Sequence, residues 1–281
     1  MAKIAKYSKA LVVSFILCCT KVSADINKHP YTAQKPLRLA VAANFKSTLE
    51  GLVAEYQSVH PVEITISAAS SGVLASQILH GAPFHMFFSA DEEKVDWLIK
   101  QGKGRYSQIY ALGQLVLWAP YSQGEALATY LSDFKHSPNR LAMANPTLAP
   151  YGKAAQETLM KLSIHVELTS HIAMANNVSQ VAQFVSSGAV KAGFVSASQL
   201  PENSQFFPID ASFYQPIKQK VLLIGSQDDE GIQQQSEAFF CYLNSLKARQ
   251  FIKKNGYALP PYENIKGIDL SSLCGKFTEL K

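Results

Sequence analysis

LRLAVAAN, at residues 37–44, sets the pattern that decides the fold: a short apolar run passes directly into small or polar residues that begin a helix. The pattern returns in ITISAASSG at residues 64–72 and in IAMANNVS at residues 172–179. Each junction offers free backbone N–H groups, with a hydroxyl or amide beside them, at a helix N-terminus, which is a favourable place for an anion. No Lys or Arg lies at the junctions themselves. The pattern therefore predicts recognition of a fully deprotonated oxyanion by neutral donors.

Strand and helix signals alternate along the chain. Apolar runs predict strands at residues 37–43, 62–67, 84–89, 115–120, 141–144, 192–195 and 220–225, and amphipathic spacing predicts helices at residues 44–60, 71–80, 90–101, 151–162, 178–187 and 233–253. Ser47 and Glu50 have the spacing of a capping box. This alternation predicts an α/β fold with parallel sheets covered by helices, whose ligands bind beyond the carboxyl ends of the strands. All three junctions lie at that edge.

The first 24 residues have the features of a secretory signal peptide. Three early Lys residues precede an apolar run at residues 10–19, and Val22-Ser23-Ala24 offers small residues for cleavage. The run is shorter than the roughly 20 residues that span a bilayer. We therefore expect export to the periplasm, a mature chain that begins near Asp25, and a flexible N-terminal arm over residues 25–36.

The formal net charge of +5 belongs mostly to this leader. Without its four Lys residues, 22 basic residues face 21 acidic ones. A nearly balanced mature chain gives no general case for nucleic-acid binding.

Two of the four cysteines would leave with the leader, and Cys241 and Cys274 would remain. In an oxidising compartment an isolated pair favours a disulfide. Two unpaired thiols are the alternative, because the sequence does not fix the distance that the bond requires. No His has ligand spacing near either Cys, so the sequence gives little support for a bare metal cation.

Six motifs share an order and spacing that point to one family. They are AANF at 42–45, ASSGVLASQI at 69–78 continuing to GAPF at 81–84, FSAD at 88–91, LAMANP at 141–146, APYG at 149–152 and NVSQ at 177–180. In these motifs the chain resembles the periplasmic molybdate-binding proteins, the solute receptors of ABC importers. The resemblance covers most of the mature chain. Two positions depart from patterns in that family: His85 stands where many relatives have Asp, and Phe194-Val195-Ser196 stands where some relatives have a Tyr.

The resemblance implies a type II periplasmic-binding fold of two lobes, each a mainly parallel sheet flanked by helices, with the anion in the cleft between them. Lobe I would comprise residues 37–117 and 200–281, and lobe II residues 118–199. Two hinge strands would join the lobes. Carried over position by position, the molybdate contacts would be Ala43, Asn44, Ser71, Tyr151 and Val178. The implied partner is an ABC permease in the inner membrane, with a monomeric receptor and no cofactor besides the ligand.

These residue types suit an unprotonated dianion with four acceptor oxygens. Ser71 would supply a hydroxyl, Asn44 an amide NH₂, and the other three positions backbone N–H groups. A carboxylate in the site would repel the dianion, and the junctions contain none. We therefore expect a molybdate receptor that also takes tungstate. Lys153, the nearest cation in the sequence, is interpreted as part of a solvated helix face.

Two other functions stay open at this point. The same fold could bind another tetrahedral oxyanion such as sulfate, because the sequence does not report the size of the cavity. A secreted hydrolase is the second alternative, although the chain has no Gly-x-Ser-x-Gly elbow, no His-Glu-x-x-His and no phosphate-binding Gly-rich loop. The expectation is therefore a binding protein and not an enzyme.

Overall fold

The computed structural model describes residues 35–225, 229–261 and 273–275. The predicted signal peptide, and the predicted arm up to residue 34, lie outside these residues. Within them the structure has two five-stranded sheets with helices around each, so the expected α/β architecture is confirmed.

The first sheet has the strand order β2-β1-β3-β10-β4. Its strands are β1 (Leu37–Ala42), β2 (Ile64–Ala69), β3 (Met86–Ser89), β4 (Tyr106–Gly113) and β10 (Ile217–Leu223). The strand β1 pairs in parallel with β2 and β3, whereas β10 runs antiparallel to both β3 and β4. The carboxyl ends of β1, β2 and β3 therefore meet at one edge.

The second sheet repeats this arrangement in the order β7-β6-β8-β5-β9. Its strands are β5 (Leu115–Trp118), β6 (Leu141–Ala144), β7 (Ile172–Ala175), β8 (Ala192–Ser196) and β9 (Phe206–Pro208). The strand β6 is parallel to β7 and β8, and β5 is antiparallel to β8 and β9. In each sheet four strands run in the same direction and one, β10 or β5, is reversed, so the sheets are mainly parallel as expected.

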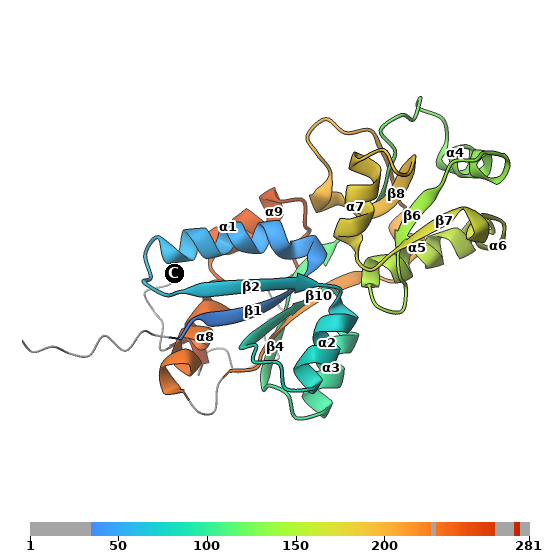
Figure 1. The fold of residues 1–281 in the computed structure, drawn as a ribbon. Helices are drawn as coiled ribbons and strands as arrows, with labels where there is room; N and C mark the ends of the chain where they lie inside the picture. Colours follow the sequence, from blue (N-terminus) through green and yellow to red (C-terminus); the bar gives the residue numbers. More distant parts are fainter. Residues whose placement is uncertain (1–34, 226–228, 262–272, 276–281) are drawn as a thin grey trace, which may run out of the picture. The chain divides into compact units, whose positions relative to one another are not determined.

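Helices cover both faces of the first sheet (Figure 1). Alternating side chains of β1 explain this: Leu37, Leu39 and Val41 pack in one apolar cluster and Ala40 in another. The first cluster includes residues of α1 (Lys46–Gln57), α8 (Glu230–Tyr242) and α9 (Leu246–Lys254), and the second includes residues of α2 (Ser71–Leu79) and α3 (Glu93–Lys100). Strand alternation thus gives the sheet two buried faces.

One large cluster forms the core around the second sheet. Its helices are α4 (Leu127–Asp133), α5 (Pro150–Lys161), α6 (His165–Leu168) and α7 (Val178–Ser186). Among the helices that the structure describes, none has the length and apolarity needed to cross a membrane.

The chain passes between the sheets at positions that differ from the expected boundaries. It leaves the first sheet at Gly113 and enters the second at Leu115, and it returns after β9 to reach Ile217. Residues 115–117 and 200–208, expected in lobe I, thus contribute strands or connections to the second sheet. The two crossings lie side by side, because Gly113 pairs with Ile217.

Two expected helices differ in detail. The single helix expected over residues 233–253 is two helices, because α8 ends at Tyr242 and the Ser245 hydroxyl caps α9 by accepting a hydrogen bond from the Ala248 N–H at 3.1 Å. The helix expected from residue 44 begins as a 3₁₀ turn, η1 (Ala43–Phe45), before α1. The capping box of Ser47 and Glu50 is not formed, since Phe45 occupies the N-cap position of α1 with no side-chain cap.

The structure contains the disulfide that the sequence left open. Cys241 in α8 is bonded to Cys274, with their Cα atoms 5.5 Å apart. Cys241 belongs to the apolar cluster on the α1 face of the first sheet, and Cys274 packs against it. The bond therefore joins the C-terminal segment to the core of the first sheet.

Candidate anion-binding site

One small pocket collects all five residues that the resemblance selected. Its wall comprises Ala42, Ala43, Asn44, Ser70, Ser71, Ala90, Ala149, Pro150, Tyr151, Asn177 and Val178. Apart from Ala90, which follows β3, these residues lie at four helical starts: η1, α2, α5 and α7. Two of the starts follow strands of the first sheet, and two follow strands of the second. The pocket thus lies where the carboxyl-end edges of both sheets supply backbone donors.

The first residues of a helix have N–H groups without an intrahelical acceptor, and the pocket wall is built from such residues. Val178 is the first residue of α7, whose N-cap Asn177 accepts a hydrogen bond from the Gln180 N–H at 3.0 Å. In α5 the first residue is Pro150, which has no N–H, so Tyr151 supplies the first donor. The positive ends of these helices favour an anion between them.

Two adjacent serine hydroxyls lie in the pocket wall. The Ser71 Oγ accepts a hydrogen bond from the Ala90 N–H at 2.9 Å, which leaves its own proton to donate. Ser70, only 4% exposed, has a buried Oγ without any hydrogen-bond partner among the described residues. A buried hydroxyl without a partner costs free energy unless a ligand or water completes it. Ser70 is therefore a further candidate donor, which the five positions taken from the resemblance do not include.

Asn44 lines the pocket, but its side-chain amide is hydrogen-bonded to other residues of the protein. Its amide NH₂ donates to Gln219 Oε1 at 2.9 Å and to the Tyr257 hydroxyl at 3.2 Å, both behind the pocket. An amide nitrogen has only two protons, so these two bonds use both. The structure thus differs from the expectation of a side-chain NH₂ contact, and it leaves the backbone N–H of Asn44 as the group that can face a ligand.

Tyr151 likewise directs its side chain away from the pocket and into the core. Its hydroxyl accepts a hydrogen bond from Gln219 Nε2 at 3.3 Å and lies 2.9 Å from Ser196 Oγ. Burial raises the pKa of this phenol well above its ordinary value, so it is neutral at physiological pH. A Cβ at Gly113 would stand 2.2 Å from the Tyr151 hydroxyl, which explains why glycine occupies the end of β4.

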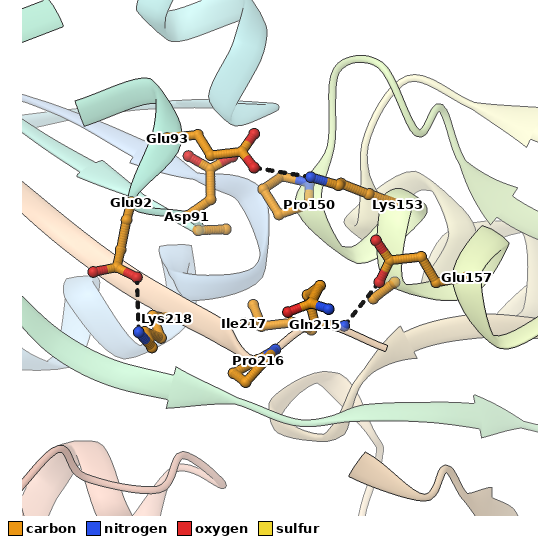
Figure 2. A pocket seen from close by; sticks show the side chains of 12 residues that line it. Asp91, Glu92, Glu93, Pro150, Lys153, Glu157, Gln215, Pro216, Ile217 and Lys218 are labelled. Carbon is orange, nitrogen blue, oxygen red and sulfur yellow. Dashed lines mark hydrogen bonds and ion pairs between the residues drawn. The ribbon is translucent and has the colours of Figure 1, made fainter. Parts of the chain in front are cut away.

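The pocket wall contains no carboxylate, Lys or Arg. Charged side chains line a neighbouring hollow of about 370 Å³ (Figure 2). This hollow shares Ala90 and Pro150 with the pocket. There Lys153 forms an ion pair with Glu93 at 2.9 Å, and Lys218 one with Glu92 at 3.2 Å. Both lysines are therefore engaged by carboxylates.

Backbone and side-chain hydrogen bonds connect the two sheets beside the pocket. The Gly72 N–H donates to the Leu148 carbonyl at 2.9 Å, and the Ser179 hydroxyl donates to the Ala43 carbonyl at 3.0 Å. The bond from Gly72 uses one N–H of α2, so Ser71 remains the donor of that turn. Among the described residues, no group of His, Cys, Asp or Glu is placed to hold a metal ion.

His85, the departure noted in the sequence, lies outside the pocket wall and immediately before β3. Its Nδ1 accepts a hydrogen bond from the Arg38 N–H at 2.9 Å. Burial, with Arg38 as the second cause, lowers the pKa of this imidazole. The residue therefore supports the start of a strand rather than the pocket.

Comparison with known proteins identifies the family. Residues 37–258 match the family described as bacterial extracellular solute-binding protein. The chain belongs to this family. The solute-binding protein is 31% identical over 256 residues to the molybdate-binding protein ModA of Azotobacter vinelandii, covering 87% of this chain and 94% of that relative. It is 30% identical over 224 residues to ModA of Rhodobacter capsulatus, covering 78% of this chain and 86% of the relative.

A solved structure supports the same relationship. The periplasmic molybdate-binding protein of Azotobacter vinelandii superposes on the solute-binding protein with a TM-score of 0.74 and 32% identity, over 80% of this chain and all of that one. The two-lobe periplasmic-binding fold implied by the resemblance is therefore confirmed. These relatives are named for binding and not for catalysis.

Proposed function

We propose that this solute-binding protein is an extracytoplasmic receptor for molybdate and tungstate that delivers the oxyanion to an ABC permease. The proposal rests on one observation above all: four helical starts and two serine hydroxyls meet in a pocket whose wall has no charged side chain. The choice of ligand is supported by relatives that are named as molybdate-binding proteins and that match most of the chain.

The donor set suits a dianion that carries no proton. The candidate donors are the backbone N–H groups of Ala43, Asn44, Ser71, Tyr151 and Val178 with the hydroxyls of Ser70 and Ser71. A hydrogen bond to a charged acceptor contributes about 1.5–3 kcal/mol, so several of them together can offset dehydration of the anion. Hydrogen phosphate would bring a proton that suits a carboxylate acceptor, and the pocket wall contains no carboxylate.

The receptor acts without a cofactor, as a monomer, after export through a signal peptide that is cleaved before residue 25. Its occupied form is what the permease recognises. No step in this role requires bond breaking, so the protein is a carrier and not an enzyme. Mass spectrometry of protein recovered from the periplasm tests the export step: the proposal expects a mature chain that begins near Asp25.

Titration calorimetry against molybdate, tungstate, sulfate and phosphate tests the ligand. We expect molybdate and tungstate to bind with similar affinity and sulfate and phosphate to bind at least a hundredfold more weakly. Sulfate binding tightly while molybdate does not would reassign the receptor to sulfate. Absence of binding by all four oxyanions would overturn the proposed function.

A further inference from the structure

Behind the candidate pocket, six uncharged side chains close a ring of hydrogen bonds, which we call the amide–hydroxyl ring. Its members, in order, are Asn44, Gln219, Tyr151, Ser196, Ser198 and Tyr257. Three of them belong to the part of the chain around the first sheet and three to the part around the second. None of the proposed ligand contacts is made by these side chains.

The ring crosses between the sheets at two links. Gln219 Nε2 donates to the Tyr151 hydroxyl at 3.3 Å, and the Ser198 hydroxyl donates to the Tyr257 hydroxyl at 2.8 Å. On the second-sheet side, the hydroxyls of Ser196 and Ser198 are 2.8 Å apart. The two sheets are thus joined by polar side chains as well as by the chain crossings.

Gln219 occupies the centre of this arrangement. It is fully buried in β10, at an irregularity of the strand's pairing with β4 between Gln219 and Lys220. Its Oε1 accepts from Asn44 Nδ2 at 2.9 Å and from the Tyr110 hydroxyl at 3.0 Å, while its Nε2 reaches Tyr151. The amide of Gln219 accepts at its oxygen and donates from its nitrogen, so one side chain serves neighbours on both sides.

The ring has no charge to be disturbed by a dianion. Burial raises the pKa of Tyr257 to about 12 and raises the pKa of Tyr151 well above its ordinary value. Five of its six residues are buried and Ser198 is partly buried, so loss of one partner leaves other groups without a hydrogen bond, at a larger cost than in water. The closed ring of hydrogen bonds therefore favours one arrangement of its six side chains.

Two ring members also form the pocket wall. Asn44 and Tyr151 contribute their side chains to the ring and their backbones to the pocket, from opposite sheets. The Tyr257 hydroxyl additionally donates to the backbone carbonyl of Asn44 at 2.8 Å, which fixes the peptide plane that follows this residue. The positions of two N–H donors therefore depend on one hydrogen-bonded unit.

We propose that the amide–hydroxyl ring positions the N–H groups of Asn44 and Tyr151 for the oxyanion, and that Gln219, Ser196, Ser198 and Tyr257 are positioning residues for binding. This inference rests on the proposed oxyanion-binding function. Its consequence is that hydroxyls which do not touch the ligand set the receptor's affinity.

The first test is Tyr151→Phe, which removes a ring hydroxyl and keeps the backbone N–H at the pocket, with Ser196→Ala as a smaller change at the adjoining position. Each should weaken molybdate binding about tenfold in calorimetry at 25 °C, the size of one net hydrogen bond. The matched control is Tyr130→Phe, because Tyr130 is a buried tyrosine of α4, in the core around the second sheet, and its hydroxyl has no partner in the described structure. That control should bind as the wild type does.

The double variant Tyr151→Phe/Tyr257→Phe tests whether the ring acts as a unit. If the two hydroxyls acted independently, the double variant would lose about a hundredfold in molybdate affinity. If one change already opens the ring, the double variant should lose little more than tenfold. Thermal unfolding of each ligand-free variant accompanies the titrations. Lowered melting temperatures with wild-type affinity in Tyr151→Phe and Ser196→Ala would overturn the inference, since the ring would then be structural only.

The wild-type titration separates the two proposals. If the wild type binds an oxyanion and the ring variants bind equally well, the ring inference fails while the receptor stands. If the wild type binds none of the four oxyanions, the proposed function fails and the inference falls with it.

Discussion

The hydroxyl of Ser71 accepts a hydrogen bond from the backbone N–H of Ala90 at 2.9 Å. This bond joins the first turn of α2 to the residue that follows β3, and both residues form the pocket wall. Ser71 is fully buried and its Oγ is held by this bond, so the position of the hydroxyl oxygen is set before a ligand arrives. An orientation set in advance lowers the entropy that binding must overcome.

Ser71→Ala should weaken molybdate binding by about 1.5–3 kcal/mol, because a donor to a charged acceptor is lost. Ser70→Ala should weaken it too, and it should raise or preserve the stability of the ligand-free protein, since an unpartnered buried hydroxyl is removed. Calorimetry and thermal unfolding of the two variants measure both effects. Wild-type affinity in either variant would remove the hydroxyl of that serine from the set of ligand donors.

Asn44→Asp should be more harmful than Ser71→Ala. A carboxylate cannot donate to Gln219 and Tyr257, and it places a negative charge at the wall of an anion pocket. We expect affinity for molybdate to fall more than a hundredfold at pH 7. Asn255→Asp, at the C-cap of α9 and outside the pocket wall, is the matched control and should bind normally. Equal behaviour of the two variants would contradict the placement of Asn44.

Lys153→Ala should change molybdate affinity less than threefold. The Lys153 ammonium is engaged by Glu93, and both side chains are about half exposed or more, at 48% and 66%. Exposed ion pairs contribute about 0.2–1 kcal/mol and are screened by salt. Calorimetry at low and high salt measures the effect. A loss of tenfold or more would show that this cation belongs to the anion site.

The stability of the protein should fall between about pH 10 and pH 12. Burial raises the pKa of Tyr56, Tyr130, Tyr242 and Tyr257 to about 12, from an ordinary value of 10. The unfolded chain therefore releases these protons first, so stability is complete below pH 10 and is lost as the pH rises through the folded values. Urea unfolding at a series of pH values measures this. Constant stability from pH 9 to pH 12 would contradict it.

Reduction of Cys241–Cys274 should lower the free energy of unfolding by about 2–4 kcal/mol, since the bond closes a loop across a separation of 33 residues. The bond lies in the core cluster of the first sheet, and neither cysteine is part of the pocket wall. Molybdate affinity of the folded, reduced protein should therefore be unchanged. Urea unfolding with and without a reductant, and calorimetry in both states, test these expectations.

The sequence by itself determined the α/β class, most element positions, and the stretches that form the pocket wall. It could do so because strand and helix periodicity acts over a few neighbouring residues. The matching motifs then selected five positions that the structure brings to one pocket. The break of the expected helix at residues 233–253 was missed, because the apolar spacing continues through Ser245 although its hydroxyl begins a new helix.

Only the tertiary structure decided how the side chains are used. Asn44 meets Tyr257 across 213 residues and Gln219 across 175, and no local pattern reports such distant partners. The same holds for the strands that enter the second sheet and for the buried hydroxyl of Ser70. Local residue types fix which groups can donate a hydrogen bond, whereas long-range packing fixes which acceptors those groups meet.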